Sequence, residues 1–274
     1  MFLVNGTGKH YIDVTDRGLQ YGDGLFETLE VVQGNPLLFD LHLQRLQAGC
    51  SKLLIPQPDL ALLTAEALAL CSDAEHAVLK IIITRGCGGR GYRQPDPVMP
   101  TRLLGLHPYP QYPASFYSEG IVARFCQHPL SINPLLAGIK HLNRLDQVLA
   151  RAEWQDDAVQ EGLMLDCEGY LVEGTMSNLF WIKNHTVYTP AIERAGINGI
   201  LRQWLLTYLG RAGIKVVIER FLPESLLAAD QVFVTNSVIG IWPVRQLHDQ
   251  LFSVGPLIRQ LQSAYQAVRC GEQR

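Results

Sequence analysis

The chain has 274 residues, of which 47% are hydrophobic and 18% are charged, enough for a substantial core in one large or two modest domains. A formal charge of −3, with both signs scattered along the chain, provides no basic stripe for nucleic acid and no acidic tail. The composition therefore favours a protein that acts on a small molecule.

The six cysteines lie far apart and form no C-x-x-C pair, which argues against a zinc or other metal site and against a disulfide framework. Residues 1–14 lack the sustained apolar core of a signal peptide, and no apolar run approaches the ~20 residues of a membrane span. We therefore expect a soluble protein in a reducing cytoplasm, with no membrane contact.

The first hundred residues predict a mixed α/β domain. Strands are expected at 1–6, 25–39 and 77–85, with helices at 40–54 and 59–71. In the first helix, Asp40 is the expected N-cap, and the expected buried face comprises Leu43, Leu46, Cys50 and Leu53. Prolines follow from residue 108 and exclude a helix, so residues 108–118 are the predicted linker.

The rest of the chain predicts a domain rich in short strands. These are expected at 121–126, 162–166, 170–174, 179–183, 186–190, 215–220 and 231–237, with two clear helices at 143–155 and 199–212. The predicted organisation is thus an α/β domain at 1–107, the linker, and a β-rich domain at 119–274.

The stretch "GCGGRGY" matches G-x-G-x-x-G through Gly86, Gly88 and Gly91 and follows a buried strand. A dinucleotide loop must open a helix, yet three prolines follow within nine residues, so that interpretation is rejected. What remains is a loop carrying Arg85, Arg90, Tyr92 and Arg93. It either binds an anionic substrate or is a solvated basic turn.

A single lysine stands ahead of the predicted helix in "LLAGIKHLNRLDQVLARAEW". Asn143 is the expected N-cap of that helix, Asp146 lies in its first turn, and its expected apolar face comprises Leu145, Val148, Leu149 and Ala152. Lys140 therefore lies in the approach to a helix, between apolar neighbours. For any single lysine a solvated surface position is the default, unless other groups make use of it.

Three further signals accompany Lys140. Glu173 ends a strand in "YLVEGTMSNLFW", where it either satisfies turn amides or does chemistry. Asn198 and Gly199 begin an amphipathic helix whose free N–H groups suit a phosphate, although an ordinary capped helix has the same pattern. Asn236 and Ser237 follow Thr235 at a strand end. Together these are an amine, a carboxylate and a phosphate cradle, the parts of a pyridoxal phosphate site.

The segments "YGDGLFET", "HLQRL", "GIKHLNRL", "EGTMSNLFW" and "GINGILRQ" resemble those of the fold-type IV pyridoxal phosphate enzymes, a family that includes branched-chain and D-amino acid aminotransferases. The likeness runs nearly end to end. It implies two α/β domains, the second of them rich in strands, with pyridoxal 5'-phosphate between them, and a homodimer. Within the family, "RGCGGRGY" and "LAGIKHLNRLDQVL" look like a lyase of folate synthesis, which implies conversion of 4-amino-4-deoxychorismate into 4-aminobenzoate and pyruvate.

The resemblance also implies residue roles. Lys140 matches the lysine that binds the cofactor covalently and acts as base, and Glu173 matches the glutamate facing the pyridine nitrogen. The implied cofactor-binding positions also include Arg45, Asn178, Gly199, Ile200, Leu201, and Asn236 or Ser237; the implied substrate positions are Phe26 and Thr28, to which we add Arg90 and Tyr92. Many relatives have threonine where this chain has Leu201, so only backbone contact is expected there. Two alternatives remain, an aminotransferase and a non-enzymatic binding or scaffold protein.

Overall fold

The computed structural model describes residues 1–271 and divides them into two compact units. Unit 1 comprises Met1–Pro110 and Ile139–Asn143, and unit 2 comprises Gln111–Gly138 and residues 144–271. The segment that carries Lys140 therefore groups with unit 1, whereas the sequence had assigned it to the second domain.

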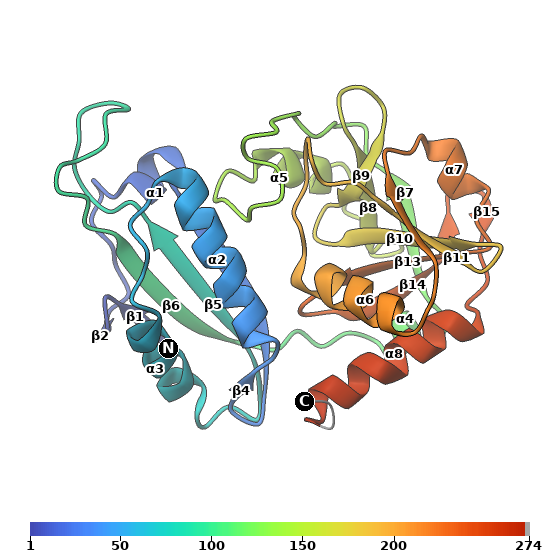
Figure 1. Cartoon of the computed structure of the whole chain (residues 1–274), viewed down its shortest axis with the longest axis horizontal. Coiled ribbons are helices and arrows are strands. Elements are labelled where there is room, and N and C mark those ends of the chain that lie inside the picture. Colours follow the sequence, from blue (N-terminus) through green and yellow to red (C-terminus); the bar gives the residue numbers. More distant parts are fainter. Residues whose placement is uncertain (272–274) are drawn as a thin grey trace. The chain divides into compact units, whose positions relative to one another are not determined.

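Unit 1 is built on an antiparallel six-stranded sheet in the order β2-β1-β6-β5-β3-β4. Its elements are β1 (Phe2–Val4), β2 (Thr7–Gly8), α1 (Arg17–Tyr21), β3 (Gly24–Val32), β4 (Asn35–Pro36), α2 (Phe39–Leu53), α3 (Leu60–Cys71), β5 (His76–Thr84) and β6 (Thr101–Pro108). Helix α2 runs along this sheet (Figure 1) and packs on β3.

The predicted helices of unit 1 form, with one correction at a cap. Helix α3 begins as expected, with the Asp59 side chain accepting a hydrogen bond from the N–H of Leu62. Helix α2 begins earlier than predicted, because Leu38 in a left-handed conformation is its N-cap and Asp40 lies inside the first turn. An acidic residue in the first turn still favours the helix through its dipole, which explains why the sequence signal was close but displaced.

Strand β3 has two different faces, as its alternating sequence indicates. Leu25, Glu27 and Leu29 are buried, and Glu27 bonds a side chain of α2. Phe26 and Thr28 are half-buried on the opposite face. The strand therefore presents one face to the helix and leaves the other to the candidate site.

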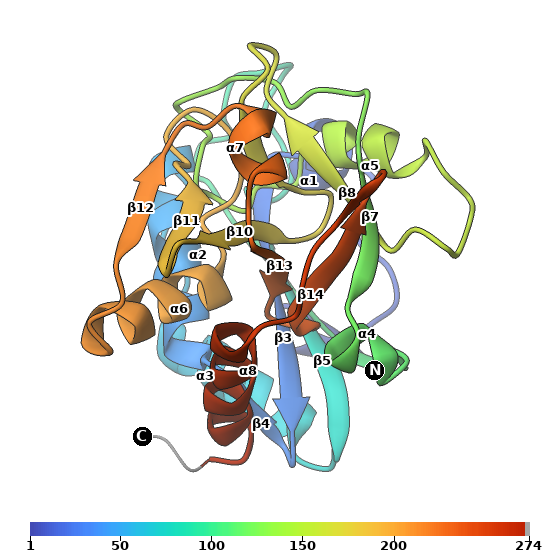
Figure 2. The ribbon, with the colours of Figure 1, turned by 90° about the vertical axis from the view of Figure 1, so that its right-hand side faces the viewer.

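Unit 2 contains a nine-stranded sheet in the order β12-β11-β10-β13-β14-β7-β8-β9, with β15 paired to β14. Its elements are α4 (Ser115–Ser118), β7 (Ile121–Phe125), α5 (Leu145–Arg151), β8 (Glu161–Leu165), β9 (Leu171–Gly174), β10 (Asn178–Lys183), β11 (Thr186–Pro190), α6 (Ile200–Arg211), β12 (Val216–Glu219), α7 (Pro223–Leu227), β13 (Gln231–Asn236), β14 (Gly240–Leu247), β15 (Gln250–Leu251) and α8 (Pro256–Arg269). Strand β7 runs parallel to both neighbours, β14 and β8 (Figure 2). Trp181 and Trp242 anchor the core of this unit.

The helix after Lys140 differs from its prediction in length, cap and facing. Helix α5 covers seven residues, and the side chain of Asn143, the expected N-cap, instead donates to the carbonyl of Gly22. The expected apolar face, Leu145, Val148 and Leu149, is exposed. The helix packs through Ala150, which joins a buried cluster, because periodicity identifies a stripe but not the direction in which a short helix faces.

Four further helices were not expected, namely α1, α4, α7 and α8. Helix α4 lies inside the proline-containing linker, where Pro113 is followed by four residues free of proline. Helix α8 begins with Pro256 in its first turn and buries Ile258, Leu261 and Tyr265 at helical spacing. In residues 1–271, no helix is both long enough and apolar enough to cross a membrane.

Candidate functional site

Lys140 is held beside strand β3 by backbone hydrogen bonds. The N–H of Phe26 donates to the carbonyl of Lys140 at 2.9 Å, and the N–H of Leu142 donates to Gly24 at 3.0 Å. The Lys140 ammonium lies 4.3 Å from the centroid of the Phe26 ring, within cation–π range. Strand pairing thus positions the amine over an aromatic face.

A second amine faces the same ring, and the sequence analysis missed it. Lys80 stands opposite Thr28 in the β3–β5 register, and its Nζ lies 5.4 Å from the Phe26 centroid. The available signal was a lysine within the apolar run "VLKIII" of a strand with one buried face. This face of the sheet therefore offers two cations beside Phe26 and a hydroxyl on Thr28.

Arg45, the predicted phosphate ligand, is fixed by a buried carboxylate. Its Nε donates to Oε1 of Glu27 at 2.8 Å and its Nη2 to Oε2 at 2.5 Å. Nδ1 of His42 lies 2.6 Å from the same Oε2. Because a guanidinium is planar, this two-point contact determines the orientation of the whole group.

The charges of this cluster follow from its burial. Burial by itself would raise the pKa of Glu27, but the charge of Arg45 and the hydrogen bonds from His42 and Arg45 outweigh it and hold the pKa at about 2. Burial lowers the pKa of His42, so the neutral imidazole donates its Nδ1–H to the carboxylate. The result is one anion and one cation locked together in the interior of unit 1.

Arg90 and Tyr92 lie in the exposed loop after β5. The Tyr92 ring packs edge-on against Tyr21, with 5.7 Å between centroids. The contact of Arg90 and Tyr92 with the substrate stays a prediction.

In unit 2, Glu173 lies near the end of β9 and is only 3% exposed. Its Oε2 accepts from the backbone N–H of Ile197 at 2.8 Å, and its Oε1 accepts from Nε2 of Gln147 at 3.3 Å. Burial lowers the pKa of Arg202 to about 10, and the nearby Glu173 charge opposes that shift. Glu173 is therefore an oriented carboxylate in a low-dielectric environment.

The loop that holds Glu173 requires a glycine at one position. Gly196 has φ +87°, and a Cβ there would stand 2.7 Å from Val172 and 3.2 Å from Oε2 of Glu173. The same loop pairs with Gly138: Gly138 donates to Gly196, and Asn198 donates to Gly138. Gly138 precedes Lys140 by only two residues along the chain.

The turn after Glu173 has its own carboxylate. Glu161 of β8 is fully buried and accepts from the hydroxyls of Thr175 and Ser177, each at 2.6 Å. Burial raises the pKa of Glu161, while these hydrogen bonds oppose the shift. Since Glu161 satisfies this turn, Glu173 is left to orient toward the loop at Ile197.

The start of α6 offers backbone amides. Its N-cap, Gly199, provides no side-chain cap, and a Cβ there would fall 1.9 Å from Oδ1 of Asn178. Nδ2 of Asn178 donates to the carbonyl of Ile197 at 2.8 Å, so this asparagine braces the approach to the helix. Ile200 and Leu201 are buried, which leaves only their backbone N–H groups for an anion.

Beside β13 the structure separates two residues that the sequence could not. Both ends of the Asn236 amide are engaged, because Oδ1 accepts from Val238 and Ile239 and Nδ2 donates to Met176. Ser237 is half-buried, and within residues 1–271 no hydrogen bond of its hydroxyl is found. Thr235 has a fully buried hydroxyl that finds no partner in the same range. A hydroxyl contact to a phosphate therefore fits Ser237 better than Asn236.

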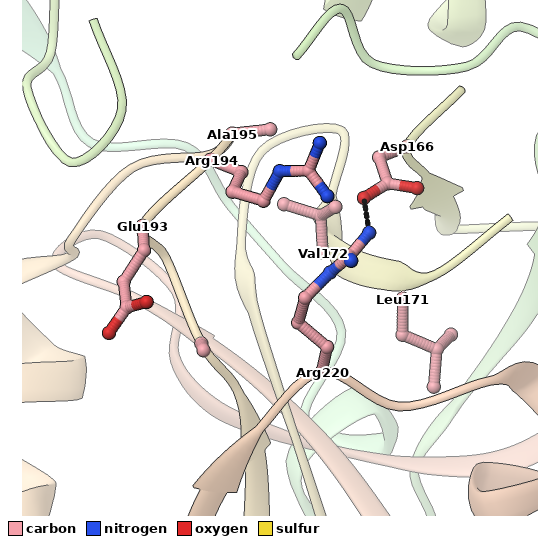
Figure 3. Close-up of a pocket in the computed structure, with 8 residues that line it drawn as sticks. Asp166, Leu171, Val172, Glu193, Arg194, Ala195 and Arg220 are labelled. Carbon is pink, nitrogen blue, oxygen red and sulfur yellow. Dashed lines mark hydrogen bonds and ion pairs between the residues drawn. The ribbon is translucent and has the colours of Figure 1, made fainter. Parts of the chain in front are cut away.

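Ion pairs link the segment before Ile197 to the β8–β9 turn, and Figure 3 shows one of them, between Arg220 and Asp166, with Arg194 beside it. Arg194 binds both carboxylate oxygens of Glu168, at 2.7 and 2.6 Å, and Arg220 reaches Asp166 at 3.1 Å and Glu168 at 2.7 Å. The cavity beside them holds about 20 Å³, room for little more than one water. The ion pairs therefore join the β8–β9 turn to the segment before Ile197. The cavity beside them is too small to admit a substrate.

Comparison with known proteins identifies relatives that match most of this chain. The family model for amino-transferase class IV matches residues 24–247. An aminodeoxychorismate lyase of Vibrio harveyi is 36% identical over 96% of this chain and 98% of its own length, and a D-alanine aminotransferase of Bacillus licheniformis is 27% identical over 93% and 90%. The crystal structure of 4-amino-4-deoxychorismate lyase from Pseudomonas aeruginosa superposes with a TM-score of 0.94 at 45% identity, covering 97% of this chain and 98% of that one.

Proposed function

Since the chain belongs to the amino-transferase class IV family, we propose that it is a lyase that uses pyridoxal 5'-phosphate to convert 4-amino-4-deoxychorismate into 4-aminobenzoate and pyruvate. The proposal is carried by the similarity, over nearly the whole chain, to two proteins named as lyases of this substrate, together with the oriented groups at Lys140 and Glu173. These groups are an amine and a carboxylate, the pair that the chemistry requires.

The residues present fit this cofactor. The uncapped start of α6, with a glycine that leaves no room for a Cβ, and the half-buried hydroxyl of Ser237 suit a phosphate. Arg45 supplies a cation whose orientation is fixed by Glu27. Lys140 would hold the aldehyde, and Glu173 would keep the ring nitrogen protonated.

The division of labour among the residues follows from their chemistry. When bound, the cofactor supplies an aldehyde that bonds to amines and a ring that accepts electrons. Lys140 Nζ removes the proton from the substrate carbon that bears the amino group, and the same amine returns a proton to the departing enol, which leaves as pyruvate. No other reactant is needed, because the ring that remains becomes aromatic 4-aminobenzoate.

The substrate is a dianion and needs cationic partners. Lys80 lies on the same face as Phe26 and Thr28, and Arg90 extends from the loop after β5. We assign the two carboxylates to these cations, with Thr28 and Tyr92 as hydrogen-bonding neighbours. We also propose that the protein works in the cytoplasm as a homodimer. Sedimentation of the purified protein would test whether it is a dimer.

The deciding experiment supplies chorismate, glutamine and the partner synthase, with and without this protein. We expect 4-aminobenzoate, followed by its fluorescence, and an equal amount of pyruvate, followed with lactate dehydrogenase. The control is the Lys140→Ala variant, which should release neither. Synthesis of both products at the same rate with the variant would refute the assignment.

An aminotransferase is the second candidate, because relatives with that name match most of the chain. An aminotransferase would use the same amine and carboxylate. It would differ from the lyase only in the fate of the electron pair left when the substrate loses its proton. Incubation with D-alanine or leucine and 2-oxoglutarate separates the two: rapid glutamate formation without 4-aminobenzoate release would favour this alternative. A purified protein that takes up no pyridoxal phosphate, judged by absorbance, would instead favour a binding or scaffold role.

A further inference from the structure

Arg17 is a buried cation that no step of the proposed reaction uses. It begins α1, is 4% exposed, and its Nε donates to Oδ2 of Asp23 at 3.0 Å. Its Nη1 reaches two backbone carbonyls of the loop after β5, Gly91 at 3.0 Å and Arg93 at 3.4 Å. A cation buried at this depth needs such partners to offset its lost hydration.

The two carbonyls stand on either side of Tyr92, and Gly91 directly follows Arg90. The backbone N–H of Arg17 also donates to the carbonyl of Gly86 at 2.9 Å, at the base of the same loop. Arg17 therefore binds the loop both at Gly86, where the loop begins, and at the carbonyls on either side of Tyr92. The side chains of Arg90 and Tyr92 are exposed, and the Tyr92 ring packs edge-on against Tyr21 of α1.

We propose that Arg17 is a positioning residue, which determines where Arg90 and Tyr92 stand and thereby the affinity for the anionic substrate. The effect on substrate affinity rests on the proposed function. The anchoring of the loop by Arg17 does not depend on that function. The planar guanidinium is needed because Nε and Nη1 serve a carboxylate and two carbonyls at once, a geometry that the single ammonium of lysine does not reproduce.

The chain contains a matched control. Arg85 is also 4% exposed, binds the same Asp23 at 2.8 and 3.0 Å, and donates to two backbone carbonyls. Those carbonyls belong to Leu53 and Leu54, at the end of α2, outside the loop. Arg85 stands at the first position of the loop, so Arg85→Lys removes buried contacts between the base of the loop and α2, whereas Arg17→Lys removes the contacts to the carbonyls on either side of Tyr92.

We expect Arg17→Lys to raise the KM for the substrate about tenfold, the effect of one lost charge-assisted contact, with kcat and cofactor absorbance within about twofold of wild type. Arg85→Lys should lower Tm about as much as Arg17→Lys does, but it should leave KM unchanged. In an Arg90→Ala background, Arg17→Lys should raise KM by clearly less than it does in the wild-type background. An equal rise of KM in Arg85→Lys, or an additive rise in the double variant, would overturn the proposal.

Limited trypsin digestion provides a readout that needs no substrate. Cleavage after Arg90 and Arg93 should be faster in Arg17→Lys than in Arg85→Lys and wild type, and equal rates would refute the anchoring. If Arg17→Lys does not fold, Gly89→Ala takes its place, since the added methyl would stand 2.3 Å from the Arg93 carbonyl and 3.2 Å from Nη1 of Arg17. A wild-type protein without lyase activity would end the proposed function, while the digestion still decides whether Arg17 holds the loop.

Discussion

The buried cluster of Glu27, Arg45 and His42 makes a strong prediction about stability. Glu27→Gln keeps the shape of the side chain but removes its charge, and it leaves the Arg45 cation in the interior with a neutral partner. Breaking one side of a buried ion pair is costly because the remaining charge stays desolvated. We therefore expect the variant to bind pyridoxal phosphate more weakly and to be less stable.

The magnitude follows from the pKa of Glu27, which is about 2 in the folded protein against an ordinary value of 4.5. Each unit of pKa corresponds to about 1.4 kcal/mol, so ionised Glu27 contributes about 3 kcal/mol at neutral pH. Because the folded pKa is the lower one, this contribution is complete above pH 4.5 and is lost as the pH falls from 4.5 toward 2. The lowered pKa of His42 acts in the same direction at a higher pH.

The measurement must report on unit 1, and all four tryptophans lie in unit 2. We suggest hydrogen exchange of the β3 amides, which the β3–β5 ladder protects, in urea at pH 7 and at stepwise lower pH. The control is Glu66→Gln, which breaks an equally bidentate pair with Arg102, at 2.6 and 2.6 Å, whose side chains are 11% and 19% exposed. That variant should lose about 1 kcal/mol or less. A Glu27→Gln protein within about 0.5 kcal/mol of wild type at pH 7, or a difference that does not shrink in acid, would show that the cluster was misread.

The remaining predictions concern the candidate site. Lys140→Ala should abolish turnover and the absorbance of covalently bound cofactor, and retained turnover would end the assignment of this lysine. Glu173→Gln should still bind cofactor while kcat falls by orders of magnitude, because the ring nitrogen loses its anionic partner; an unchanged kcat would refute that role. Gly199→Ala, whose methyl would overlap Oδ1 of Asn178, should raise the Kd for pyridoxal phosphate by about tenfold or more, as measured by absorbance titration. Ser237→Ala should raise the same Kd about tenfold, the effect of one lost hydrogen bond to a charged group, and an unaltered Kd would remove the hydroxyl from the phosphate site.

Much of the local structure could be predicted from the sequence. Helix α6 begins after Gly199 as expected, Glu173 stands near the end of its strand, and strand alternation correctly places Phe26 and Thr28 on one face of β3. The amine, the carboxylate and the phosphate cradle indicated the cofactor, and the resemblance to a family added the reaction, which no periodicity contains. These are properties of short windows, in which neighbouring residues determine the conformation.

The partners of the buried charges were decided by the tertiary structure alone. Glu27 meets Arg45 across 18 residues, and Arg17 reaches Gly91 across 74. Such contacts depend on which elements the fold brings together, and a local pattern carries no record of that. The same reason explains the exposed face of α5: spacing identifies an apolar stripe, but only the packing of Ala150 determines which way the helix turns.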